Sequence, residues 1–315
     1  MNLKNFKKLS GDASFRQFFR SNNAVIVFSK KDKTSNLLIY DAINSILLNN
    51  NILAPKLIEQ EYSKNFIKIE DFGDKNMLHQ IQNSRQKVRE YQKILKILNK
   101  IQKIRNYETK TFLGTKFKLS KYTKKKLLNE SYLFLEWYLP YIFKNKIDHK
   151  IKKKIKKIIQ DLYLKLKLKN IVFVHRDFHV SNMMIKNKRI ALIDNQDAIL
   201  GNPAYDLASL IDDVRIKTSN KLKSQILNIY TRKLKNIDKN EFTNDFEILS
   251  VLRNLKIIGI FSRLAIRDKK LKYLRLIPYA WKLIEHRLKN NSEFHQLKMV
   301  LKKKSKDKKC KLKQL

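Results

Sequence analysis

One stretch of the sequence, from residue 173 to residue 210, concentrates side chains that could carry out chemistry. It reads FVHRDFHVSNMMIKNKRIALIDNQDAILGNPAYDLASL. Its polar side chains include His175, Asp177, His179, Asn182, Asp194, Asp197 and Asp206. Because the whole chain carries 70 Lys and Arg against 28 Asp and Glu, a local group of acids marks this stretch as a candidate site.

Three of these residues offer oxygen atoms of the kind that phosphoryl transfer uses. The carboxylate of Asp177 can orient a hydroxyl, and the side chains of Asn182 and Asp194 can hold a hard cation. Mg²⁺ takes one or two such protein oxygens and completes its octahedron with phosphates and water. The pattern therefore predicts phosphoryl transfer from a nucleotide.

The first 75 residues are predicted to form short strands and one helix. β-branched and aromatic residues favour strands at 5–10, 15–20, 24–29, 56–61 and 65–70. Apolar residues at three- and four-residue steps predict a helix over 35–51, before Pro55. In the second strand, alternation places Arg16, Phe18 and Arg20 on one face and Phe15, Gln17 and Phe19 on the other.

Beyond residue 75 the apolar spacing becomes helical. Residues 85–104 and 149–168 repeat apolar side chains at i, i+3, i+4 and i+7, which is typical of helices packed on one face. Strands are predicted at 171–177 and 189–194, and helices from Asp206 to about Asn291. We predict an α+β fold with a small mixed-sheet lobe at 1–74, a mostly helical lobe at 75–299 and a basic tail at 300–315.

The formal net charge of +42 would suit a nucleic-acid or membrane partner. The basic residues are spread along the chain without a recognition motif, and low Gly and Pro counts of 5 and 4 indicate a compositional bias. We expect no specific nucleic-acid partner, no membrane partner and a monomer. A single cysteine, Cys310, and the lack of a signal-peptide pattern predict a cytoplasmic protein.

The pattern H-R-D-x-x-x-x-N, from His175 to Asn182, followed after a strand by Asp194, resembles the protein-kinase-like superfamily. The resemblance implies a two-lobed fold that binds ATP and Mg²⁺. It makes Asp177 the catalytic aspartate and Asn182 and Asp194 the metal ligands. Where protein kinases have D-F-G, this sequence has IDNQDA. That replacement resembles the aminoglycoside phosphotransferase and choline kinase branch and implies a small-molecule substrate.

Further blocks resemble the bacterial N-acetylmuramate/N-acetylglucosamine anomeric kinases over roughly residues 5 to 290. They are GDASFRQFFR, IEDFGD, LNESYLFLEWYL, HRDFHVSNMMI, LIDNQDAILGNPAYDLASLIDD and IGIFSRLAIRDKKLKYLRLIP. This resemblance implies phosphorylation of the anomeric hydroxyl of an amino sugar during cell-wall recycling. Within it, Glu130, Glu136 and Trp137 are candidates for a sugar-binding wall, or else belong to an ordinary packed helix.

The sequence departs from the kinase pattern where the nucleotide phosphates would bind. The strand at 24–29 contains no lysine, the next helix contains no Glu, and no G-x-G-x-x-G loop is present. Arg16 and Arg20 are therefore candidates for the phosphate clamp, with Lys30 as the positional replacement for the usual lysine. Glu70 is expected to meet an adenine edge through its backbone.

Other polar residues of the stretch have supporting roles in this interpretation. His175 is grouped with the catalytic loop, where packing and backbone hydrogen bonding are favoured over acid–base work. His179 is expected to brace Asp194. Asp206 is either an N-cap or first-turn carboxylate or, as the resemblance implies, a support for the catalytic loop. Asp197 is left open between substrate contact and support of its neighbours.

Two alternative functions remain open at this point. The first is a kinase for another small hydroxyl compound, such as an aminoglycoside, choline or an amino alcohol. The second is a basic nucleic-acid-binding protein without catalysis, against which the intact set of Asp177, Asn182 and Asp194 argues.

Overall fold

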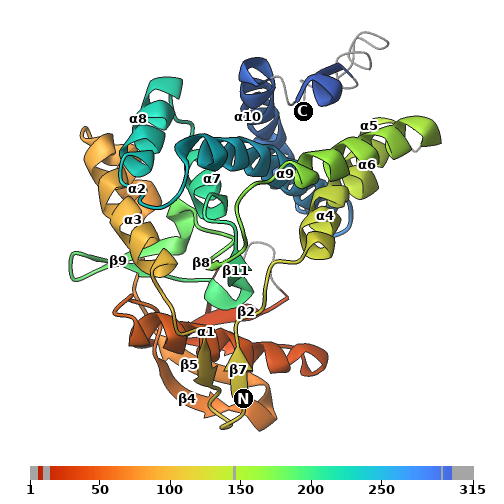
Figure 1. Ribbon diagram of the computed structural model, residues 1–315. Coiled ribbons are helices and arrows are strands. Elements are labelled where there is room, and N and C mark those ends of the chain that lie inside the picture. The colour runs from red at the N-terminus through yellow and green to blue at the C-terminus, as the bar shows by residue number, and fades with distance from the viewer. Residues whose placement is uncertain (1–5, 10–14, 145–146, 292–293, 300–315) are drawn as a thin grey trace. The chain divides into compact units, whose positions relative to one another are not determined.

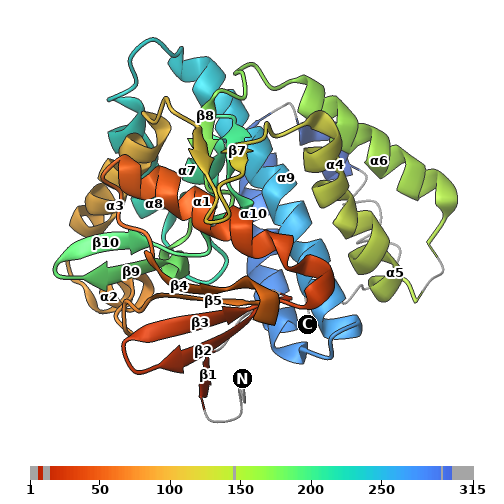
Figure 2. The same cartoon turned by 90° about the horizontal axis from the view of Figure 1, so that it is seen from below.

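The structure is a computed structural model that describes residues 6–9, 15–144, 147–291 and 294–299. The chain divides into two compact units. Residues 1–121 and 171–201 belong to the first unit, and residues 122–170 and 202–315 belong to the second. Figures 1 and 2 show the helices and strands from two directions. The tail at 300–315 lies outside the described residues.

An antiparallel sheet of five strands begins the first unit, as far as the described residues show. Its order is β1 (Lys7–Leu9), β2 (Gln17–Ser21), β3 (Ala24–Phe28), β5 (Phe66–Glu70) and β4 (Leu57–Glu61). The five strands predicted from the sequence are confirmed. The sheet was expected to be mixed, but every strand is antiparallel to its neighbours, and the short turns after β2 and β4 leave no room for a crossover between those pairs.

Helix α1 (Ser35–Asn49) lies across one face of this sheet. Its Leu37 and Tyr40 pack against Val25 and Val27 of β3 in one core cluster, which Phe18 joins from β2. Phe19 belongs to a second cluster, with Ile26 and Phe66. The side-chain alternation predicted for the second strand is therefore confirmed, because neighbouring phenylalanines pack in separate clusters.

The remainder of the first unit supplies the loops that carry the candidate site. Strand β8 pairs with β11, and strands β9 and β10 form a hairpin. The bounds are α2 (Met77–Asn83), α3 (Lys87–Gln102), β6 (Glu108–Lys110), β7 (Lys116–Lys118), β8 (Val172–Val174), β9 (Met183–Lys186), β10 (Arg189–Leu192) and β11 (Ile199–Gly201).

The second unit is built around helix α9 (Lys239–Ile266), which is buried over most of its length. Because every residue of α9 from 248 to 259 is buried, its polar ones included, other parts of the unit must cover it on several sides. The elements of this unit are α4 (Lys124–Leu133), the π-helical turn η4 (Phe134–Tyr138), α5 (Leu139–Ile142), α6 (His149–Leu164), α7 (Tyr205–Ile211), α8 (Asn220–Thr231), η7 (Leu271–Leu276) and α10 (Ile277–Asn290).

The helices predicted at 85–104 and 149–168 are confirmed as α3 and α6. In α6 the apolar stripe is buried and the lysines between its members are largely exposed. The contacts group residues 75–121 and 171–201 with the sheet. Contacts alone do not decide where two lobes hinge, so the boundary after residue 74 stays a prediction. Across the described parts of the chain, no helix is both long enough and apolar enough to span a bilayer.

Candidate active site

The loop that follows β8 holds Asp177 and Asn182 in a fixed relation. The backbone N–H of His179 donates to the Asp177 carbonyl at 2.9 Å, and the backbone N–H of Asn182 donates to the His179 carbonyl at 2.9 Å. The side-chain amide of Asn182 donates to the Asp177 carbonyl at 3.1 Å. This last bond fixes the orientation of the Asn182 amide.

A β-hairpin brings Asp194 to the same place. Asn182 comes just before β9, and Asp194 follows β10 by two residues. Met183 is paired with Leu192, and the Ile193 N–H donates to the Asn182 carbonyl at 3.0 Å. The two residues therefore lie at the same end of the hairpin, as the predicted strand between them suggested.

Two non-glycine residues at this site have left-handed backbone conformations. Arg176 has a φ of 73° and Asp194 a φ of 62°. Such conformations are disfavoured for residues with a Cβ and are kept where the surroundings enforce them, frequently at functional sites. Here one lies in the loop that carries Asp177 and the other at the proposed metal ligand itself.

The carboxyl of Asp194 lies in an environment that disfavours its charge. Partial burial raises its pKa, although 40% of the side chain is exposed, and the negative charges of Asp177 and Asp197 act in the same direction, while Arg16 and a hydrogen bond from Gln196 oppose them. A group of acids that repel one another is stabilised by a bound cation. The site therefore has the electrostatic character of a cation site.

The donor atoms fit Mg²⁺ held jointly with phosphates. Among the residues that the structure describes, no three His, Cys, Asp or Glu side chains cluster in a way that could enclose a metal ion. Asp194 and Asn182 instead offer a carboxylate and an amide oxygen on one side. Mg²⁺ accepts such an incomplete set because it keeps waters and phosphate oxygens as its other ligands.

Gln196 and Arg176 hold the segment after Asp194. The Gln196 amide donates to Asp194 at 2.8 Å and to Asp197 at 3.3 Å. Arg176 donates to the backbone carbonyl of Asp197 at 3.0 Å and to its carboxylate at 3.3 Å. Asp197 therefore has a supporting contact, and its side chain is still about half exposed.

Arg16 reaches the site from the residue before β2. Its guanidinium lies 3.6 Å from the Asp194 carboxylate and donates to the side chain of Asn36. Its Cζ lies 5.2 Å from the ring centre of Phe15 and 5.8 Å from that of Tyr40. The side chain is 4% exposed, so this cation is fixed beside the proposed metal ligand.

The other two candidate phosphate-binding cations lie elsewhere. Arg20 is ion-paired with Asp71 and, at 2.8 Å, with Asp74. Lys30 follows the end of β3 and is exposed. Of the three cations proposed from the sequence, the structure brings Arg16 to Asp194.

Glu70 ends β5 and is held on both sides. Its carboxylate pairs with Lys186 at 2.7 Å, and its N–H donates to the Lys56 carbonyl at 2.9 Å. Because this N–H is occupied, an adenine edge would have to use other backbone atoms of the 70–74 segment. Backbone contact by Glu70 itself stays a prediction.

The two histidines of the loop are buried. His175 is fully buried, and its Nε2 lies 3.2 Å from the Ile193 carbonyl. This contact ties the loop to the segment that leads into Asp194 and fits a bracing role. His179 is 3% exposed. Its expected bracing of Asp194 stays a prediction.

The remaining sequence candidates belong to the second unit. Glu130 pairs with Lys256 at 2.9 Å and accepts a hydrogen bond from Tyr122. Glu136 is exposed and Trp137 half-buried, and both lie in the π-helical turn η4. Asp206 is fully buried in the first turn of α7, whose N-cap is Ala204. Asp206 is thus a first-turn residue and not the N-cap.

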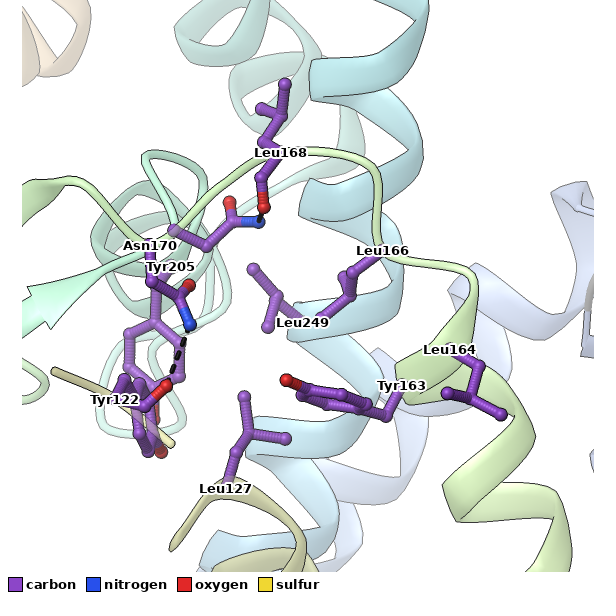
Figure 3. Close-up of a pocket in the computed structure, with 10 residues that line it drawn as sticks. Tyr122, Leu127, Tyr163, Leu164, Leu166, Leu168, Asn170, Tyr205 and Leu249 are labelled. Atoms are coloured by element: carbon purple, nitrogen blue, oxygen red, sulfur yellow. Dashed lines mark hydrogen bonds between the residues drawn. The ribbon is translucent and has the colours of Figure 1, made fainter. Parts of the chain in front are cut away.

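The second unit also contains a pocket of about 180 Å³. Figure 3 shows Leu127, Leu249 and the Tyr163 ring around it. All its lining residues are uncharged leucines, tyrosines and asparagines, so its chemistry does not suit a phosphate or a cation. Tyr122 lines this pocket and also donates to Glu130.

Sequence reasoning did not identify Asn36, Tyr40 or Gln196. The two α1 residues could have been found from their spacing, because Asn36, Tyr40 and Asn44 recur every four residues, on one face of the helix. Gln196 lies between two acids that were singled out. It carries no charge, and its bridging contacts depend on the turn that follows Asp194.

Comparison with known families gives a match over most of the chain. Residues 5–238 match the model of a family described as the phosphotransferase enzyme family. An N-acetylmuramate/N-acetylglucosamine kinase of Neisseria meningitidis serogroup B is 26% identical over 280 residues, which cover 85% of this chain and 81% of that protein. One of the same name from Pseudomonas aeruginosa is 26% identical and covers 93% of this chain and 86% of that protein.

Solved structures with a similar fold include antibiotic and choline kinases. The ADP-bound aminoglycoside phosphotransferase APH(2'')-Ib superposes with a TM-score of 0.59 at 17% identity, covering 90% of this chain and 95% of that one. A choline/ethanolamine kinase family protein from Mesorhizobium loti gives a TM-score of 0.62 at 9% identity, covering 96% and 94%. These likenesses confirm the predicted protein-kinase-like α+β fold.

Proposed function

Because this chain belongs to the phosphotransferase enzyme family, we propose that it transfers the γ-phosphoryl group of ATP to a sugar hydroxyl. The observation that carries the proposal is the convergence of Asp177, Asn182, Asp194 and Arg16 within one unit. Three oxygen-bearing side chains and one buried cation are what in-line transfer between a nucleotide and a hydroxyl needs.

Each residue has a role that its position allows. Asp177 orients the acceptor hydroxyl and takes its proton. Asn182 and Asp194 would hold Mg²⁺, which supplies charge neutralisation on the phosphates when it is bound. Arg16, beside Asp194, would fork onto phosphate oxygens. The ADP bound to the aminoglycoside phosphotransferase of similar fold supports the choice of a nucleotide donor.

We propose that the acceptor is the anomeric hydroxyl of N-acetylmuramate or N-acetylglucosamine. The names of the relatives from Neisseria meningitidis and Pseudomonas aeruginosa support this choice. Glu136 and Trp137 would line the acceptor site, since an aromatic ring and a carboxylate suit the apolar face and hydroxyls of a sugar. Glu130 would take part through its network with Lys256 and Tyr122. The enzyme would act as a cytoplasmic monomer.

An ADP-release assay over a panel of acceptors tests the proposal. The panel contains N-acetylmuramate, N-acetylglucosamine, an aminoglycoside and choline, and ³¹P NMR then locates the phosphate on any product. We expect turnover with the acetamido sugars and a phosphate on the anomeric oxygen. Turnover only with the cationic acceptors would overturn the sugar assignment, and no ADP release with any acceptor would overturn phosphoryl transfer itself.

A further inference from the structure

Helix α1 packs on the sheet (Figure 2) and carries polar residues among the apolar side chains of one face. Asn36, Tyr40 and Asn44 are spaced four residues apart, so their side chains leave the helix on the same side. Ile43 and Leu47, seven and eleven residues after Asn36, lie on this same side and are buried. Apolar side chains alone would suffice for packing there, so the three polar residues call for another explanation.

Each of these three polar residues contacts the candidate site. Asn36, in the first turn of α1, accepts a hydrogen bond from Arg16. The ring of Tyr40 lies beneath the Arg16 guanidinium. Asn44 accepts a hydrogen bond from Asn195 at 2.8 Å and donates to the Pro55 carbonyl at 3.1 Å. The helix therefore contacts both Arg16 and the residue that follows Asp194.

We propose that Asn36 is a positioning residue, which aims the Arg16 guanidinium at the nucleotide phosphates without neutralising it. The inference rests on the proposed nucleotide-dependent function. It goes beyond that function by assigning to α1 a specific part in nucleotide binding. Asn44, through Asn195, holds the same helix against the segment that carries Asp194, so the cation and the metal ligand share one support.

The neutrality of Asn36 follows from what Arg16 must do. Arg16 already faces one carboxylate, that of Asp194, at 3.6 Å. A second carboxylate on α1 would compete with phosphate oxygens for the same N–H donors. An amide oxygen gives the guanidinium a fixed acceptor and leaves its positive charge for the ligand. The Phe15 and Tyr40 rings restrict the remaining freedom of the side chain.

The test is a double-mutant cycle on nucleotide binding by the full chain. Calorimetric titration with MgADP compares the parent protein with Arg16→Ala, Asn36→Ala and the double variant. Alanine is a better helix former than asparagine, so Asn36→Ala should not weaken α1. Asn49→Ala, an exposed asparagine at the other end of the same helix, is the matched control.

We expect Asn36→Ala to weaken MgADP binding about five- to tenfold and Arg16→Ala at least as much. The double variant should bind no more weakly than Arg16→Ala alone, because Asn36 acts through Arg16. Asn49→Ala should bind like the parent. Asn36→Asp should weaken binding more than Asn36→Ala, because it retains an acceptor but cancels the charge.

Four outcomes would overturn the inference. Three of them are a parental affinity for MgADP in Asn36→Ala, in Asn36→Asp or in Arg16→Ala. The fourth is a double variant whose loss of affinity equals the sum of the losses in the two single variants. In all four, the parent still binds MgADP and the proposed function survives. A parent protein that binds neither MgADP nor MgATP would instead remove the nucleotide-dependent function, and the inference with it.

Discussion

The guanidinium of Arg16 lies 3.6 Å from the carboxylate of Asp194. The two residues come from the two separate chain segments of the first unit. In protein kinases a lysine of the third strand contacts the nucleotide phosphates and forms an ion pair with a glutamate on a helix. Here Arg16, which comes just before β2, donates a hydrogen bond to Asn36 of α1 and lies next to the proposed metal ligand.

This relationship gives the first prediction, on the three candidate cations. Arg16→Ala should raise KM for ATP about tenfold or more, since a charge-assisted bidentate contact would be lost. Lys30→Ala should leave KM close to the parental value because Lys30 is exposed beyond the end of β3. Steady-state kinetics with varied ATP measure both.

Arg20→Ala is the matched arginine control for that experiment. Arg20 is engaged by Asp71 and Asp74, so its loss should lower the thermal midpoint and change KM for ATP less than Arg16→Ala does. If Lys30→Ala alone impaired ATP use while both arginine variants behaved like the parent, the phosphate clamp would be a displaced lysine.

The sequence predicts the fold of this chain well, because apolar periodicity and strand composition are local signals. All five sheet strands, α1, α3 and α6 follow from them. The site is predicted only where a motif carries it, as at Asp177, Asn182 and Asp194. That Arg16 and not Arg20 meets Asp194 could not be predicted. Alternation places both arginines on the same face of the predicted strand, and which one meets Asp194 depends on α1 and on the segment after β5.

The second prediction concerns Asp177. Asp177→Asn removes the group that orients the hydroxyl and accepts its proton while leaving Asn182 and Asp194 unchanged. We expect kcat to fall by about 10² to 10⁴ and MgADP affinity to stay close to the parental value. Parental turnover in this variant would exclude Asp177 from the proposed mechanism.

Asp194 gives a third prediction, which separates metal binding from folding. Asp194→Ala should abolish activity and weaken binding of the Mg²⁺ complex of ADP far more than binding of metal-free ADP. Calorimetric titrations with and without Mg²⁺ make the comparison within one variant. Equal losses in the two titrations would show that Asp194 supports the fold and not the metal.

A fourth prediction comes from a glycine in the middle of α9. A Cβ added at Gly259 would lie 2.3 Å from the carbonyl carbon of Leu133 and 2.5 Å from the backbone nitrogen of Phe134. Backbone atoms cannot rotate away as a side chain can. We expect Gly259→Ala to destabilise the protein by about 1 to 3 kcal/mol, even though alanine favours helix.

Thermal unfolding of Gly259→Ala and Gly259→Ser tests this steric explanation. The loss should be greater for serine than for alanine because serine is larger. The contact lies where α4 passes into the π-helical turn that carries the proposed acceptor residues Glu136 and Trp137, so KM for the acceptor should also rise. A stabilised alanine variant would mean that α9 and α4 are not so closely packed. Periodicity indicates a helix here but not how near its neighbour lies.

The last prediction uses a carboxyl that is buried on α1. Burial raises the pKa of Asp41 to about 6, against an ordinary value of 3.8. Between these two values the folded protein binds more protons than the unfolded chain, so the free energy of unfolding decreases as pH rises from about 4 to about 6. Above that range this group causes no further change.

Its ionisation costs about 3 kcal/mol at most by that point, since one pKa unit corresponds to about 1.4 kcal/mol. Asp41→Asn removes the ionisation and puts a neutral amide of similar size in place of the protonated carboxyl, so we expect a gain of up to about 3 kcal/mol at pH 7.5. Urea unfolding of parent and variant at pH 4, 5, 6 and 7.5 measures the difference, which should disappear toward pH 4. A difference that stayed constant across this range would show that the ionisation of Asp41 is not its cause.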